Sequence, residues 1–205
     1  ALICMCEQYA ESESSNDLAL VCIYLDFIKF CQQPSGTFLN YVSYDRQFTT
    51  QNEEVNLEDS IGRTIWALGF VLSKHDSLPK TIVLQADMIF KKAISCIEDI
   101  HSTRAMAFLI KGLYYANKQE NISLIDLFAK RLAAMYAHEA AEDWEWFEHS
   151  LTYANSLLPE AMLLAGLASG ERRYQQIALQ SFEFLLNHIF DSDGIHVISN
   201  EYWSE

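Results

Sequence analysis

Glycine and proline are scarce in this 205-residue sequence, which contains 7 Gly and 3 Pro. Because the turns between strands rely on these two residue types, their shortage argues against a β-sandwich or β-barrel and favours helices. Positive charge is scarce as well. The sequence has 14 Lys and Arg but 28 Asp and Glu, which gives a net charge of −14. This balance argues against contacts with a phosphate backbone, so no nucleic-acid partner is predicted.

Long apolar runs are also missing. No segment reaches the roughly 20 apolar residues that a membrane span needs, so no membrane partner is predicted. The sequence shows no signal peptide. The cysteines are odd in number and form no CxxC pair, which predicts buried free thiols and a reducing, cytoplasmic location. They are Cys4, Cys6, Cys22, Cys31 and Cys96.

Half of the residues are hydrophobic and 13% are aromatic, which is enough for a sizeable core. We therefore predict a single helical domain over residues 1–205. Apolar residues recur at helical spacing almost throughout, with a polar loop at 45–59 and a turn at 191–194. The expected helices cover about residues 17–33, 60–73, 79–97, 103–116, 122–136, 143–151, 159–168 and 172–190.

Most of the predicted helices are joined by short connections, which make neighbours antiparallel and pair them into hairpins. Three helices, expected to end at Gly69, Gly112 and Gly166, carry small residues among large ones and few charges. Such helices are expected to be packed on most sides, whereas their partners have one polar face. An apolar inner layer inside an amphipathic outer layer predicts an all-α fold of antiparallel hairpins, either a closed toroid or an open α-solenoid.

Three sequence strings carry a family resemblance. They are Gly36–Arg46 (GTFLNYVSYDR), Glu58–Gly69 (EDSIGRTIWALG) and Trp146–Ala161, which contains WFE, LTYAN and LPEA. These strings resemble bacterial proteins with an (α/α)6 toroid of the six-hairpin glycosidase type, many of which are labelled glycosyltransferase-like. The resemblance implies a partial or truncated toroid that binds or processes carbohydrate. It also implies a sugar or oligosaccharide as ligand, with a glycosyltransferase module or a homo-oligomer as the protein partner.

Two departures from the family pattern bear on activity. Relatives carry Leu-Thr-Tyr-Asp-Asn where this sequence has Ala154, so a carboxylate at the pocket is missing. A closed ring of this type needs six hairpins. This sequence has enough helices for only part of such a ring. The enzymatic question therefore stays open among glycoside hydrolysis, sugar isomerisation and a non-catalytic accessory role.

In such a toroid, the ends of the inner helices and the loops before them open onto a central cavity. Glycoside hydrolysis needs two carboxyl groups. Asp59 and Glu160 lie at comparable places before two inner helices, so they are the predicted catalytic pair. The predicted substrate-binding residues supply aromatic faces and hydrogen-bonding groups: Asp45, Arg46, Glu58, Arg63, Trp66, Trp146, Glu148, Tyr153 and Asn155.

No metal ion and no cofactor are predicted. His138-Glu139 begins an HExxH-like string, but the second His is absent. The sequence also contains no GxGxxG or P-loop string, so a nucleotide-sugar site is not expected in this chain.

Structural roles are an alternative for the same residues. Acidic side chains at helix starts, such as Glu58, Asp59 and Glu160, cap N–H groups and complement the helix dipole. Arg63 could neutralise such an acid, and Trp146 could be a core anchor. The competing function is a protein-interaction scaffold of the tetratricopeptide kind. That fold needs a regular period of about 34 residues, whereas the three glycines are 43 and 54 residues apart.

Overall fold

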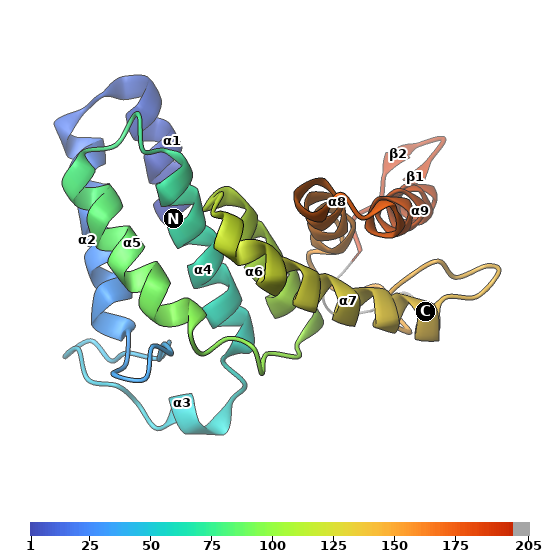
Figure 1. Cartoon of the computed structure of the whole chain (residues 1–205), viewed down its shortest axis with the longest axis horizontal. Coiled ribbons are helices and arrows are strands. Elements are labelled where there is room, and N and C mark those ends of the chain that lie inside the picture. The colour runs from blue at the N-terminus through green and yellow to red at the C-terminus, as the bar shows by residue number, and fades with distance from the viewer. Residues whose placement is uncertain (199–205) are drawn as a thin grey trace. The chain divides into compact units, whose positions relative to one another are not determined.

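The computed structural model describes residues 1–198 and shows an all-α fold, which confirms the predicted fold class (Figure 1). A two-stranded antiparallel hairpin follows the last described helix. The α-helices are α1 (Leu2–Ser12), α2 (Ser15–Cys31), α3 (Gln51–Glu54), α4 (Glu58–Ser73), α5 (Lys80–Ile94), α6 (Thr103–Tyr115), α7 (Ile122–Glu139), α8 (Leu157–Ser169) and α9 (Arg172–Ile189). A 3-10 turn, η1 (Gln119–Asn121), precedes α7, and the strands are β1 (Phe190–Asp191) and β2 (Gly194–Ile195).

The chain divides into two compact units, and the single domain over residues 1–205 stays a prediction. The first unit covers Ala1–Lys118 and the second begins at Gln119. Within residues 1–198, no helix combines the length and the apolar character that crossing a lipid bilayer requires.

In the first unit, α4 is the central helix and packs against α5, α6 and α1. Its contact with α6 is made through glycines that lie inside the two helices. A Cβ atom added to Gly69 would lie 2.0 Å from the carbonyl oxygen of Gly112, and one added to Gly112 would lie 2.4 Å from that of Ile65. The prediction that these glycines end their helices is wrong. They allow two helix backbones to touch.

The expectation of a helix packed on most sides is confirmed for α6, in which every residue from Thr103 to Leu113 is buried. In contrast, α5 buries one face and exposes Lys91 and Lys92 on the other. Pro79 precedes the first residue of α5, as predicted. An apolar inner helix and an amphipathic outer helix therefore both occur in this unit.

The second unit consists of α7, α8 and α9, with α8 packed against both neighbours. Gly166 lies inside α8 rather than at its end, because the helix continues to Ser169 and is terminated by Gly170 in the left-handed conformation (φ 75°). The turn predicted at 191–194 is confirmed, since it joins β1 to β2. The expectation that the tail lacks helix holds up to Ile198, and residues 199–205 lie outside the described part.

The short helix predicted at 143–151 is wrong. The segment is irregular and begins with a bridge between Ala141 and Trp144. Trp146 and its neighbour Phe147 are both fully buried. These side chains reach the core from an irregular backbone.

Two further features differ from the sequence predictions. The helix α1 was not predicted, and the polar loop extends from Gln32 to Leu57 with α3 inside it. All five cysteines are free thiols, as predicted. Cys6 and Cys31 are buried, but Cys4 and Cys22 are exposed, so the predicted burial is wrong for these two.

Candidate functional site

The residues predicted to form a sugar site fall into two groups, one in each unit. In the first unit, Glu58 and Asp59 begin α4 and reach the start of α6. The Glu58 carboxylate accepts hydrogen bonds from the backbone N–H groups of His101, at 3.0 Å, and Ser102. Asp59 Oδ1 accepts one from the Ser102 hydroxyl at 3.0 Å. Both carboxylates thus lie at the N-terminus of α6, where negative charge complements the helix dipole. These contacts give the two acids a capping role at α6, rather than at the start of their own helix α4 as the sequence predicted.

Asp59 also belongs to a stack of charged and aromatic side chains along α4 and α6. The Arg63 guanidinium lies 3.9 Å from the Asp59 carboxylate and 4.4 Å from the Phe108 ring centroid. Phe108 stacks on Trp66 with a centroid separation of 5.4 Å, and Lys111 Nζ lies 4.2 Å from the Trp66 ring. Two cations therefore flank two stacked rings, an arrangement that stabilises both cations. The structure brings together the predicted residues Asp59, Arg63 and Trp66.

Sequence reasoning did not identify Phe108 and Lys111 as members of this stack. The sequence feature that could have identified them is their spacing: Phe108 and Lys111 are three residues apart on α6, as Arg63 and Trp66 are on α4. Side chains three apart share one helix face. Matching spacings on two helices become informative only once the two helices are known to pack together.

Asp45 and Arg46 belong to a separate feature of the first unit, an exposed loop hairpin bridged by Val42 and Phe48. Arg46 adopts a left-handed backbone conformation (φ 58°), and its N–H group donates to the carbonyl of Ser43 at 3.0 Å. Arg46 thus completes a tight turn, and both side chains face solvent.

The same loop is held from inside by Asn52 of α3. Its side-chain oxygen accepts from the N–H groups of Asn40 and Tyr41, both at 2.8 Å. Its amide nitrogen donates to the carbonyls of Tyr41, at 2.8 Å, and Thr49, at 2.9 Å. All of the hydrogen-bonding capacity of this buried side chain is used on the loop backbone.

In the second unit, Trp146 is fully buried and packs in the core. Its ring stacks on Phe184 at 6.0 Å and meets Phe147 edge to face at 5.5 Å. These contacts support the core role of Trp146. Nearby, the Glu148 carbonyl accepts a hydrogen bond from the Trp144 indole at 2.7 Å.

Glu160 is exposed in the first turn of α8. A carboxylate at this position complements the positive end of the helix dipole. The two predicted catalytic residues, Asp59 and Glu160, thus belong to different units, and both lie where a structural role is available to them. Their catalytic assignment stays a prediction.

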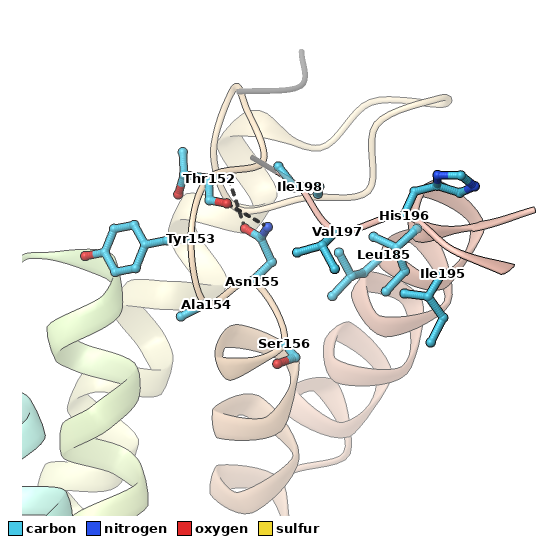
Figure 2. A pocket seen from close by; sticks show the side chains of 11 residues that line it. Thr152, Tyr153, Ala154, Asn155, Ser156, Leu185, Ile195, His196, Val197 and Ile198 are labelled. Atoms are coloured by element: carbon cyan, nitrogen blue, oxygen red, sulfur yellow. Dashed lines mark hydrogen bonds between the residues drawn. The ribbon is translucent and has the colours of Figure 1, made fainter. Parts of the chain in front are cut away.

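The remaining two predicted residues, Tyr153 and Asn155, line a pocket of about 400 Å³ at the N-terminal end of α8 (Figure 2). The Asn155 amide bonds to the backbone of Thr152, accepting from its N–H at 3.1 Å and donating to its carbonyl at 3.2 Å. Ala154 between them is left-handed (φ 50°). The lining comprises Thr152, Tyr153, Ala154, Asn155, Ser156, Leu185, Ile189, Ile195, His196, Val197 and Ile198.

The side of the pocket after β2 is organised by a histidine and an aspartate. His196 Nε2 lies 2.8 Å from Asp191 Oδ2. Hydrogen bonds from the Asp193 backbone and from His196 lower the pKa of the Asp191 carboxyl, so this group is ionised near neutral pH. In Figure 2 the His196 ring is turned away from Leu185 and Val197, so the imidazole faces outward.

Within residues 1–198, no group of three or more His, Cys, Asp or Glu side chains is placed to hold a metal ion. The arrangement at the pocket offers hydroxyl and amide groups on one side and aliphatic side chains on the other. No protein-family model matches this sequence, and no curated protein matches it.

Proposed function

We propose that this chain is a carbohydrate-binding helical protein, part of an (α/α)6 toroid, and that the pocket at the N-terminal end of α8 holds the sugar. One observation carries the proposal: residues 152–155 of the LTYAN string, which resembles the family, line a pocket of about 400 Å³. A volume of this size lies in the range of small-molecule sites, which is about 300–1,000 Å³. The presence of a fully packed α6 and an amphipathic α5 in one unit is also in line with the inner and outer helices of a toroid.

The chemistry of the described lining supports binding more directly than hydrolysis. Asn155 contributes an amide and Ser156 a hydroxyl group to the lining, whereas the Thr152 and Tyr153 side chains point away from Leu185 and Val197 (Figure 2). Hydrolysis of a glycosidic bond needs a pair of carboxyl groups on either side of the bond. We therefore propose a binding or accessory role, while the catalytic roles of Asp59 and Glu160 and an interaction-scaffold function stay predictions.

The proposal includes a bacterial cytoplasmic location, with a glycosyltransferase module or a second copy as partner. The free state of all five cysteines supports a reducing compartment. The excess of acidic residues favours neutral sugars over anionic ones, because like charges repel.

The test is a binding screen with the full chain, using isothermal titration or ligand-observed NMR. The panel comprises glucose, galactose, mannose, N-acetylglucosamine, maltose and cellobiose. Ser156→Phe places a ring at the pocket and should weaken binding at least tenfold. The matched control Ser192→Phe makes the same change at the exposed β1–β2 turn, outside the pocket lining, and should bind as the wild type does. Absence of saturable binding, or an equal loss in both variants, would refute the proposal.

A further inference from the structure

The pocket at α8 has two chemically different sides. Asn155 and Ser156, where the chain leads into α8, supply its polar groups. The opposite side is aliphatic and is formed by Leu185 and Ile189 of α9 together with Ile195, Val197 and Ile198. Figure 2 shows Leu185 and Val197 on the side of the pocket across from Asn155.

The aliphatic side is held in place by defined contacts. The His196 backbone N–H donates to the Ile189 carbonyl at 2.7 Å, which ties the segment after β2 to the end of α9. The His196 ring is drawn outward to Asp191. The one imidazole in the lining is therefore turned away, and aliphatic groups make up this side.

A simple sugar would use only the polar side of such a pocket. Hydroxyl groups project from all around a sugar ring, and those facing the aliphatic side would lose water without gaining a hydrogen-bond partner. The polar side is also partly used, because the Asn155 amide already bonds to the Thr152 backbone. A ligand with a polar end and an aliphatic end matches both sides.

We propose that the ligand is a glycoside carrying an aliphatic chain, with its sugar at Ser156 and its chain against Leu185, Ile189 and Val197. This inference rests on the proposed function and specifies the class of carbohydrate. Each methylene group moved out of water onto the aliphatic side should strengthen binding by about three- to fourfold if fully buried. Val197 is 88% exposed and Ile195 63% exposed, so the gain per methylene is expected to be smaller.

The experiment is a calorimetric or NMR titration of the full chain with methyl, butyl and hexyl β-D-glucopyranoside and with 1-hexanol. All ligands are used below any critical micelle concentration. Affinity should rise at least tenfold from the methyl to the hexyl glucoside, and 1-hexanol should bind at least tenfold more weakly than hexyl glucoside. Val197→Ser should reduce the gain with chain length. Leu179→Ser, which alters an exposed residue of α9 outside the pocket lining, should leave it unchanged.

The outcomes separate the two proposals. Equal affinity for the methyl and hexyl glucosides overturns the inference and leaves sugar binding in place. Equal affinity for 1-hexanol and hexyl glucoside overturns the proposed carbohydrate function, because the sugar then contributes nothing. If Val197→Ser and Leu179→Ser reduce the rise of affinity with chain length equally, the alkyl chain binds non-specifically. That result overturns the inference. Failure of every ligand to bind overturns both.

Discussion

The backbones of Gly69 and Gly112 meet directly between α4 and α6, where a Cβ atom on Gly69 would lie 2.0 Å from the Gly112 carbonyl oxygen. Gly69→Ala should therefore lower the free energy of unfolding by roughly 3 kcal/mol, the upper end for overpacking, although alanine is the better helix former. Chemical denaturation measures this loss. The control Gly170→Ala, where a Cβ meets nothing within 4 Å but φ is 75°, should cost about 1 kcal/mol. A smaller loss for Gly69→Ala than for the control would contradict the packing interpretation.

Asn52 should be essential for the loop between α2 and α4. Asn52→Ala removes four hydrogen bonds and leaves the N–H groups of Asn40 and Tyr41 without their acceptor, so we expect a loss of roughly 2–4 kcal/mol. Hydrogen exchange of the Tyr41 amide should accelerate in the same variant. Gln51→Ala, an exposed change on the same helix, should stay within about 0.5 kcal/mol of the wild type. Similar effects of the two substitutions would argue against this role of Asn52.

The stability of the second unit should fall at both extremes of pH. Hydrogen bonds from Lys130 and Tyr174 lower the pKa of Asp126, so this stabilisation is present above the ordinary pKa of about 4 and is lost as pH falls through the lowered value. Burial and the hydrogen bond to Asp126 raise the pKa of Tyr174. Its contribution is therefore complete below the ordinary tyrosine pKa of about 10 and is lost as the pH rises further.

Tyr174→Phe tests this pair, because it removes the 2.7 Å hydrogen bond to Asp126. At neutral pH the variant should lose roughly 1.5–3 kcal/mol, the range for a hydrogen bond to a charged group. Melting temperatures across the pH range should show a weaker alkaline decline than in the wild type. Tyr44→Phe alters a fully exposed tyrosine and should change neither quantity. An unchanged alkaline profile in Tyr174→Phe would exclude the assignment.

The cysteines should differ in reactivity according to burial. Burial raises the pKa of Cys6 to about 11 and also raises the pKa of Cys31, so little reactive thiolate forms at neutral pH. Cys4 and Cys22 are exposed and should be alkylated first. Mass spectrometry of a time course with iodoacetamide gives the order, and denaturant should bring all sites to the same rate. Early labelling of Cys6 in the folded protein would mean that α1 opens readily.

Ala154 stands where the resemblance implies a carboxylate, and this implication can be tested. Its left-handed backbone (φ 50°) is unfavourable for alanine but is tolerated by Asn and Asp. Ala154→Asn and Ala154→Asp should therefore both stabilise the protein by about 0.5–1 kcal/mol in thermal unfolding. The aspartate alone adds a charged hydrogen-bond acceptor, so it should strengthen sugar binding about tenfold or more relative to the asparagine. Equal affinities in the two variants would show that a carboxylate at this position does not contact the sugar.

Helical periodicity predicted most of the fold because each amphipathic stripe is a local property of the sequence. The helix α1 was missed because it begins without a side-chain cap after Ala1, so the usual start signal is absent. The glycines were assigned to helix ends because a sequence does not show which helix faces another. Only the close approach of α4 and α6 reveals why Gly69 and Gly112 are small.

The candidate site was less accessible to sequence reasoning. The sequence predicts that Glu58 caps the helix it begins, whereas its partners lie at the start of α6, more than 40 residues away in the chain. No local pattern reports such a contact. The apolar spacing around Trp146 suggested a helix, whereas the segment is irregular and Trp146 packs on Phe184 of α9. The aliphatic side of the pocket arises from α9 and from residues after β2, which only the folded chain brings together.

The stack beside Asp59 has an optical consequence. Trp66 is the one tryptophan in the sequence of the first unit, and it lies between Phe108 and the Lys111 ammonium. Trp144 and Trp146 belong to the second unit and pack around Phe184. The two units therefore carry indoles in different electrostatic surroundings. Their fluorescence provides built-in reporters that can show whether the units unfold together or in sequence.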